Sequence, residues 1–529
     1  MADFDSSFVS TGRHPDQRRM AARPRQGRAQ ADQLGGAYLG ASNTASISYL
    51  TVLPVQFGIL VIGPWAGKAT AAPSLPFDDC RTYAPEIQTM PLAPATRDEL
   101  KKLYNALKDR ILEPDDPVYV EEINQGIANH VVVDPVEEMA TEIDWQEGGG
   151  VCLFTGQRGT GKSTELQRLK RRLEDLGAEV FYADLSEFLL LTKEVEISDF
   201  LIAVAGAMSE QMKDRYGGSP GDRSYWDRIS AFLQTKVEIK DLGFKVAGVD
   251  IKAALKDDPD FKRRVQEAAR GHVAQLVRDA HDFLAEGVQY VREQRGDPEC
   301  KVVLLIDSVE RIRGVGSEAM AVYESVRNLF FGHAEHLKVP VLHMVYTIPP
   351  YLSVLAAGAG ALMGGAVTRR LVSTHIFKDR SREPDRAGLE RLRTVIAKRY
   401  PDWKKIFEPA ALDELALNSG GDLREFFRLI RLCLPSVRDD AQLPLNVEAI
   451  KQANNAARGE MLPIPEDHLG WLKRISQTHD TCLEKDADLP TLAHFLDNRL
   501  VLNYRNGSDW YDVHPLLRDV VDAYVSADA

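Results

Sequence analysis

The sequence predicts an α/β protein built on a parallel sheet with helices on both faces. Three apolar segments, 151–155, 302–306 and 339–347, have the length and the Val, Leu and Ile content of buried strands. Helical stretches separate these segments along the chain, and such alternation favours a parallel sheet covered on both sides. A chain of 529 residues is too long for one compact core, so several domains are expected.

The N-terminal residues 1–89 differ in composition from the rest of the chain. Arginines crowd residues 11–30, and residues 44–67 carry no charge. Pro54 and Pro64 interrupt the uncharged stretch, which makes it a poor membrane span, and it starts too far from the terminus for a secretory signal. We expect residues 1–89 to be a disordered or non-native extension, with translation starting at Met90. A membrane anchor is the less favoured alternative.

Charge and cysteine usage narrow the classes of function. A net charge of −13 argues against a protein that coats nucleic acid through bulk electrostatics. The five cysteines are dispersed and form no CxxC pair, which fits a reducing compartment better than a disulfide framework. We therefore expect a cytoplasmic protein without a membrane partner.

Residues 90–140 are predicted to form a helical and extended linker to the core. Leu100, Leu103 and Leu107 lie on one stripe of a helix over residues 95–111. Two prolines in the following stretch, 112–120, exclude helix there and favour an extended chain.

A complete phosphate-binding motif follows the first buried strand. Residues 156–163 match G-x-x-x-x-G-K-[ST], and a predicted helix follows them, so the context argues against a chance match. In such a loop, backbone N–H groups and a helix N-terminus face the phosphates. Lys162 would contact the β- and γ-phosphates, the Ser163 hydroxyl would bind Mg²⁺, and Thr164 lies one residue into the helix. The predicted nucleotide-binding residues of the loop are Gly156, Gln157, Arg158, Gly159, Thr160, Gly161, Lys162, Ser163 and Thr164.

The second buried strand ends in a pair of acids. Asp307 is predicted to hold a magnesium-bound water, and Glu310, three residues on, to polarise the attacking water. The alternative is that Asp307 only caps the next helix and Glu310 is a surface acid. Thr347, at the end of the third strand, is a candidate polar sensor between Glu310 and the γ-phosphate, although a structural threonine is equally compatible.

Together these features predict a P-loop NTPase core over residues 141–380. Alternating apolar residues and two glycines predict an inserted β-ribbon at about 235–252. The Gly/Ala-rich segment 356–366 has too little bulk to pack and is predicted to be a mobile loop.

Two further modules are expected after the core. Helical patterns over residues 381–460 predict a helical lid. Residues 461–529 contain two predicted helices and then alternating strands around Asn506-Gly507, a strong hairpin signal, so we expect a C-terminal winged-helix-like module.

The order of these features resembles the AAA+/STAND branch of P-loop ATPases, and within it bacterial ATPases related to the NACHT and KAP groups. The sequences GQRGTGKSTEL (156–166) and IDSVERI (306–312) carry the resemblance. It implies ATP and Mg²⁺ as ligands, hydrolysis of ATP to ADP and phosphate, and a homo-oligomer. It also implies a second sensor arginine in the lid, for which Arg424 is the candidate, and an extended segment around Tyr119 that lines the adenine.

The resemblance leaves the finger arginine open. Arg369, Arg370 and Arg399 are candidates for an arginine supplied to a neighbouring subunit, and a solvated surface role suits each of them. Ser308 follows Asp307 where AAA+ motors have an adjacent Asp-Glu pair. This departure favours a slow switch over a fast motor.

Three functions remain as hypotheses. The leading one is an ATP-dependent switch that regulates or senses within a multi-protein bacterial system, such as anti-phage defence, and acts on a separate effector protein. A DNA-associated ATPase of the initiator or loader type is disfavoured, because residues 466–529 carry twelve acidic against six basic side chains. The third is a nucleotide-dependent scaffold with little hydrolysis.

Overall fold

A computed structural model describes residues 92–524, except 125, 129–130, 237–249, 315, 356–362, 364 and 366–367. The chain divides into two units, Met1–Ala84 and Pro85–Ala529, and all described residues belong to the second. None of the helices in these described residues combines the length and apolar character needed to span a bilayer.

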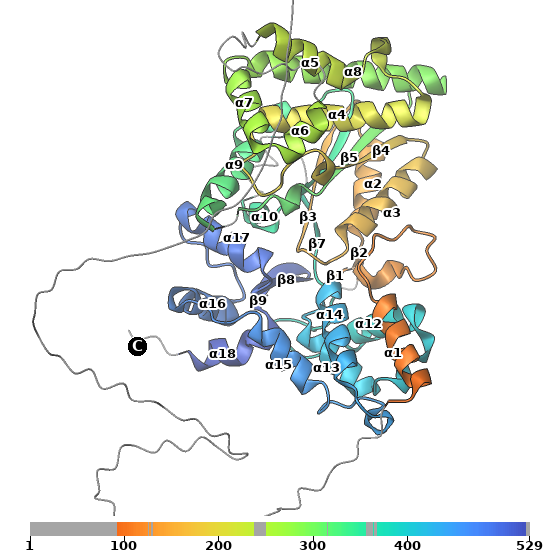
Figure 1. The fold of residues 1–529 in the computed structure, drawn as a ribbon, viewed down its shortest axis with the longest axis vertical. Coiled ribbons are helices and arrows are strands. Elements are labelled where there is room, and N and C mark those ends of the chain that lie inside the picture. The colour runs from red at the N-terminus through yellow and green to blue at the C-terminus, as the bar shows by residue number, and fades with distance from the viewer. Residues whose placement is uncertain are drawn as a thin grey trace, which may run out of the picture. The chain divides into compact units, whose positions relative to one another are not determined.

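A five-stranded parallel sheet forms the centre of the second unit, as the sequence predicts (Figure 1). Its strands lie in the order β4, β5, β6, β3, β7. The connection leaving β3 runs to the edge strand β4, whereas the one leaving β6 passes β3 to reach β7. In open α/β sheets, ligands bind at the carboxyl ends of the strands where the crossover direction changes, here between β3 and β6. The strands are β3 Val151–Gly156, β4 Glu179–Asp184, β5 Val302–Asp307, β6 His343–Ile348 and β7 Thr368–Leu371.

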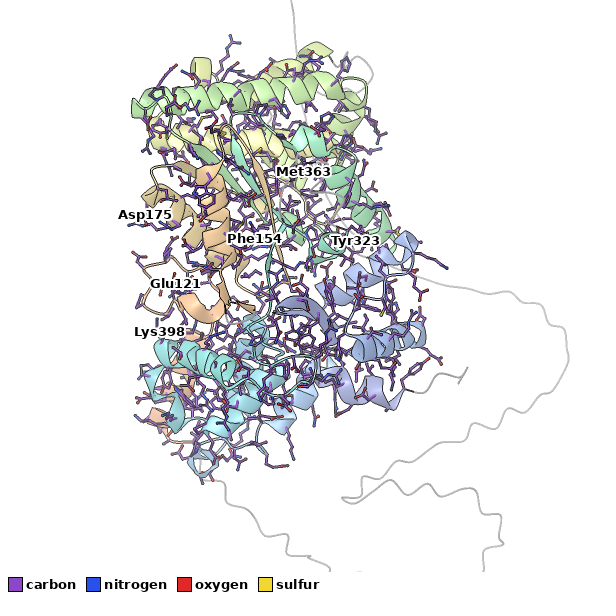
Figure 2. All side chains as sticks on the ribbon, turned by 180° about the vertical axis from the view of Figure 1, so that it is seen from behind. Glu121, Phe154, Asp175, Tyr323, Met363 and Lys398 are labelled. Carbon is purple, nitrogen blue, oxygen red and sulfur yellow. The ribbon has the colours of Figure 1, made fainter. Side chains whose placement is uncertain are left out.

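Alternate strand residues face two different hydrophobic clusters, because successive side chains in a strand point to opposite faces. Phe154, labelled in Figure 2, packs with helices α2 (Pro135–Trp145) and α3 (Lys162–Asp175). Leu153 faces the other side and packs in a second, larger hydrophobic cluster, to which α4 (Ile197–Tyr216) also contributes. Both faces of the sheet are therefore covered.

Helices extend the larger cluster beyond α4. These are α5 Tyr225–Lys236, α6 Ile251–Asp257, α7 Pro259–Arg270, α8 Val273–Arg295, α9 Ala319–Phe331 and α10 Pro350–Val354. In Figure 1, α4 and α8 run alongside each other, and both contribute to this cluster.

Three expectations for this region need revision or lie outside the described residues. The predicted ribbon at 235–252 is wrong at both ends, since 235–236 finish α5 and 251–252 begin α6, while 237–249 lie outside the described residues. The amphipathic pattern over about 259–294 predicts one long helical stretch, whereas the structure has two helices separated at 271–272. Most of the predicted loop 356–366 lies outside the described residues.

A second group of helices, called the lid below for its place in the chain, has its own core, the lid cluster. It consists of α12 Arg386–Arg399, α13 Pro409–Asn418, α14 Leu423–Cys433 and α15 Lys451–Gly459. The distant helix α1 (Pro94–Ala106) joins this core through Leu100 and Leu103. A short hairpin, β1 Gly126–Ala128 with β2 Val131–Val133, follows α1 along the chain.

The C-terminal residues form helices and the predicted hairpin. The elements are α16 Glu466–Thr478, α17 Leu489–Asp497, β8 Val501–Asn506, β9 Ser508–Val513 and α18 Arg518–Ala523. The strands pair antiparallel around Gly507, whose φ of 89° suits the tight turn. Val501 packs into the larger cluster and Leu502 into the lid cluster, so β8 joins the two cores. The winged-helix assignment itself stays a prediction.

Candidate functional site

The phosphate loop lies between the carboxyl end of β3 and the start of α3. Gly159 and Gly161 have φ of 103° and 99°, a region that side chains disfavour. A Cβ at Gly159 would come within 2.7 Å of Asp422 Oδ1, so the lid approaches the loop backbone closely. Thr160 Oγ1 donates a 2.8 Å hydrogen bond to the Gln157 carbonyl and braces the turn.

Lys162 points back over the loop. Its Nζ donates hydrogen bonds to the carbonyls of Gly156, at 2.7 Å, and Gln157, at 3.0 Å. The same nitrogen lies 3.6 Å from Glu310 Oε1. The predicted lysine and the predicted base are thus brought together.

Asp307 is buried at the end of β5 and held by three donors. The Tyr182 hydroxyl donates to its Oδ2 at 2.6 Å, the Ser308 N–H donates to its Oδ1 at 2.7 Å, and the Ser163 hydroxyl also bonds it. Burial, and then the nearby Glu310 carboxylate, raise the pKa of Asp307 above its usual value. A divalent cation at this point would favour the charged carboxylate.

A strained residue turns the chain after Asp307. Ser308 is buried with φ of 71°, and it is followed by a short 3₁₀ turn, Val309–Arg311. Val309 N–H donates to Thr347 Oγ1 at 3.2 Å, so Thr347 anchors this turn. Glu310 is brought over the phosphate loop in consequence, only 8% of its side chain is exposed, and its Oε2 has no hydrogen-bond partner among the described residues.

The residues expected to bind Mg²⁺ fit such an ion. The Ser163 hydroxyl and the Asp307 carboxylate are both oxygen donors, as Mg²⁺ prefers, and they lie within hydrogen-bonding reach of each other. No cluster of three or more His, Cys, Asp or Glu side chains suited to a metal occurs in the described residues. Phosphate oxygens and water would therefore have to complete the coordination.

A cavity of about 280 Å³ opens beside the loop, between the core and the lid. Its polar and charged lining includes Lys162, Ser163 and Glu310 at the loop, and Lys108, Asp109 and Arg110 from the N-terminal segment. Apolar and aromatic side chains also line it: Leu112, Tyr119, Val120, Ile123, Val395, Leu423 and Phe427. A phosphate loop and apolar side chains in one cavity match the chemistry of a nucleotide.

The N-terminal segment closes one side of this cavity through bonds to α3 and the lid. Tyr119 donates from its hydroxyl to Glu165 Oε1 at 3.0 Å, and its carbonyl accepts from Lys398 Nζ at 2.6 Å. Thr164 Oγ1 accepts from the Leu112 N–H at 3.2 Å. Burial raises the pKa of Tyr119, so its hydroxyl stays protonated. Tyr119 and Thr164 both line the cavity, and their contact with nucleotide stays a prediction.

Arg424 also lines the cavity, from the start of α14 in the lid. Its guanidinium forms an ion pair with Asp109 at 2.7 Å. Asp422 caps this helix by accepting from the Glu425 N–H at 2.8 Å, which fixes the direction of the helix start toward the phosphate loop.

The three candidate finger arginines differ in their surroundings. Arg369 pairs with Glu138 at 3.2 Å and Glu142 at 3.1 Å, and Arg370 pairs with Asp509. Arg399 lines the cavity beside the phosphate loop, with its guanidinium 4.7 Å from the centre of the Phe427 ring, and donates a 3.1 Å hydrogen bond to the Ala106 carbonyl. To reach another subunit, Arg369 and Arg370 would have to leave carboxylate partners, and Arg399 a backbone carbonyl.

Gln157 connects the phosphate loop to the C-terminal hairpin. Its side-chain nitrogen donates to the carbonyls of Val501, at 2.6 Å, and Leu496, at 3.4 Å, and its oxygen accepts from the Asn503 N–H at 2.9 Å. The side chain is buried. The motif predicts Gln157 as a loop residue, but no sequence pattern indicates this contact, which joins residues about 340 positions apart in the chain.

Tyr182 is a site residue that sequence analysis missed. It lies on β4, which pairs in parallel with β5, and this register brings its hydroxyl to Asp307. A tyrosine in an apolar strand carries no signal of such a role; only the strand order supplies it.

Known proteins offer weak similarity. No protein-family model and no curated protein match the chain. Among solved structures, the Aeropyrum pernix ORC2 protein in ADPNP-ADP complexes is 11% identical, with 78% of this chain and 98% of that chain covered and a TM-score of 0.32. The Walker-type ATPase paby2304 of Pyrococcus abyssi is 12% identical, with 77% and 99% covered and a TM-score of 0.35. The Thermotoga maritima RuvB Holliday junction branch migration motor is 12% identical, with 76% and 99% covered and a TM-score of 0.30. These similarities are too low to assign a family or an activity.

Proposed function

We propose that this chain binds ATP with Mg²⁺ and hydrolyses it slowly to ADP and phosphate. The observation that carries the proposal is the buried meeting of Lys162 and Glu310, 3.6 Å apart, over a complete phosphate loop. A carboxylate with one unpartnered oxygen beside the phosphate-binding lysine has the position required of a base that orients water.

Each residue has a distinct task in this proposal. Loop N–H groups and Lys162 bind the phosphates, and Lys162 exchanges its contact with Glu310 for the γ-phosphate. Glu310, thereby released, orients the attacking water. Ser163 and Asp307 would hold Mg²⁺, which neutralises charge that develops on the phosphates. Thr347 positions Glu310 through the Val309 N–H.

The apolar and aromatic side chains that line the cavity support adenine as the base. Tyr119 and Val120 line it from the N-terminal segment, and Val395 and Phe427 from the lid. A bound nucleotide would therefore touch both core and lid, with Arg424 at the junction. This supports a conformational switch, in which the nucleotide state changes how the lid meets the core.

The regulatory part of the proposal extends the resemblance to AAA+/STAND ATPases. We propose that the chain acts on a separate effector protein as the regulatory or sensing component of a bacterial multi-protein system, such as anti-phage defence. We expect a homo-oligomer to form with ATP. Contacts from the phosphate loop to the C-terminal hairpin support a switch, because they give the nucleotide site a mechanical connection to another module.

Lys162→Ala tests the binding site. Loss of the lysine removes the cation at the β- and γ-phosphates, so we expect ATP affinity to fall at least about 10-fold and turnover to vanish. Fluorescent-nucleotide titration, a phosphate-release assay and mass photometry with and without ATP would measure this.

Lys193→Ala is the matched control, since Lys193 is partly exposed and pairs with Glu318 away from the cavity. Unchanged binding and turnover in Lys162→Ala would contradict the proposal. Binding without turnover in the wild type would replace hydrolysis with a scaffold function.

A further inference from the structure

A second cavity adjoins the nucleotide cavity. It has a volume of about 170 Å³ and is lined by Gly156, Arg158, Glu310, Arg311, Arg313, Pro350 and Asp497. Arg158, Glu310 and Arg311 line both cavities, so the two meet beside the carboxylate that faces Lys162. At this volume the second cavity suits an ion or a single phosphoryl group rather than a nucleoside.

Its wall is rich in unpaired cations. Arg158, Arg311 and Arg313 are exposed, and within the described part of the chain none of them forms a side-chain hydrogen bond or ion pair. Partial desolvation of its exposed side chain, followed by the neighbouring charges of Arg313, Arg424, Arg499 and Arg311, lowers the pKa of Arg158. Like charges gathered without partners raise the free energy of the protein, and an anion among them would lower it.

Besides Glu310, a carboxylate of the C-terminal module lines this cavity together with the arginines. Asp497 ends α17 and accepts a 3.3 Å hydrogen bond from the Tyr323 hydroxyl of α9 (Tyr323 is labelled in Figure 2). Its surrounding charges include Arg313, Lys162 and Arg158. Asp497 follows Leu496, whose carbonyl accepts from Gln157 of the phosphate loop, so its position is tied to that loop.

We propose that the second cavity is a phosphoryl subsite, in which Arg158, Arg311 and Arg313 bind an anionic phosphoryl group and Asp497 opposes it. The group is either the terminal phosphoryl of a bound nucleoside triphosphate or the inorganic phosphate released from it. This inference rests on the proposed function and adds to it a site for the product end of the reaction. The Asp497 carboxylate would repel a phosphoryl group bound by the arginines. Because Asp497 belongs to the C-terminal module, phosphoryl binding would disfavour the present position of that module.

Titration with inorganic phosphate tests the subsite. Isothermal calorimetry of the full chain with Mg²⁺, both without nucleotide and saturated with ADP, would give the phosphate affinity. We expect Arg313→Gln to weaken phosphate binding about 10-fold, the effect of losing one charge-assisted hydrogen bond. Asp497→Asn should strengthen it several-fold while keeping an acceptor for Tyr323. Neither residue lines the nucleotide cavity, so ADP affinity should not change.

Arg171→Gln serves as the control, because Arg171 is exposed on α3 and pairs with Asp175. A non-hydrolysable ATP analogue distinguishes the two sources. Weaker analogue binding by Arg313→Gln identifies the terminal phosphoryl, and unchanged analogue binding with weaker phosphate binding identifies the released product.

Two results would overturn the subsite. One is phosphate binding by Arg313→Gln and Asp497→Asn that equals the wild type. The other is no phosphate binding by a wild type that binds ADP normally. Failure of the proposed function looks different, because the wild type would then bind neither ADP nor the analogue, and phosphate binding to the nucleotide-free chain would still decide the subsite.

Discussion

Lys162 and Glu310 illustrate how single residues define this site. The motif alone predicts the loop glycines and Lys162, because backbone geometry and local spacing fix them. Glu310 was predicted from its spacing to Asp307, yet its approach to Lys162 depends on the left-handed Ser308, which no spacing predicts. Tyr182 and Gln157 acquire their contacts through sheet order and long-range packing, so sequence patterns could not reveal them.

Buried His343 predicts a loss of stability in acid. It lies on β6, neither ring nitrogen has a hydrogen-bond partner among the described residues, and burial lowers its pKa to about 4. Between pH 6.5 and 4 the unfolded chain binds a proton that the folded chain does not, so the free energy of unfolding falls as pH falls through this window. The full effect is about 3 kcal/mol.

His343→Leu should reduce this pH dependence. Urea denaturation at pH 7.5 and 4.5 would measure the difference for wild type and variant. The fully buried His514, whose pKa burial also lowers to about 4, should retain a similar contribution in the variant. If the free energy of unfolding of His343→Leu changes with pH as much as that of the wild type, the His343 side chain already binds a proton in the folded state.

At the scale of elements, long and strongly patterned segments were predictable and short or charged ones were not. The apolar strands β3, β5 and β6, and the hairpin β8–β9, follow from composition and turn chemistry. Strand β7 is four residues long with two arginines, so its sequence resembles a loop, and only pairing with β3 makes it a strand. The break between α7 and α8 falls at a glycine within otherwise helical sequence.

The turn after β5 should tolerate glycine and reject β-branched residues at position 308. Ser308 has φ of 71°, where a β-branched side chain meets a steric penalty. Ser308→Val should therefore lower the free energy of unfolding by about 1–3 kcal/mol, and turnover should fall because Glu310 moves. Ser308→Gly should keep the free energy of unfolding within a few tenths of a kcal/mol of the wild-type value, and turnover should stay near that of the wild type. Equal stability of the two variants in urea denaturation would rule out strain at this turn.

At the scale of the whole second unit, β8 joins the core to the lid. Its alternate residues belong to two different hydrophobic clusters, and its backbone forms hydrogen bonds with the side chain of Gln157 in the phosphate loop. A change in loop conformation on nucleotide binding would thus be felt at the hairpin. This long-range connection, too, could not be predicted from the sequence, because it joins modules that lie far apart in the chain.

Gln157→Ala should weaken this connection. The change leaves the Val501 carbonyl and the Asn503 N–H without their buried partner, so the free energy of unfolding should fall by about 2–4 kcal/mol. Hydrogen exchange in β8 should also accelerate. Gln289→Ala, at an exposed position of α8, is the control and should change neither. If hydrogen exchange in β8 is as slow in Gln157→Ala as in the wild type, Gln157 does not stabilise the hairpin.

The most direct measurement is the steady-state ATP turnover of Glu310→Gln beside that of the wild type, with ATP affinity measured on the same samples. Glu318→Gln, exposed and paired with Lys193, is the control. We expect Glu310→Gln to lose at least about 100-fold in turnover while it still binds ATP, because only the base is removed. Equal turnover in Glu310→Gln and wild type would show that Glu310 is not the base and that the site does not work as proposed.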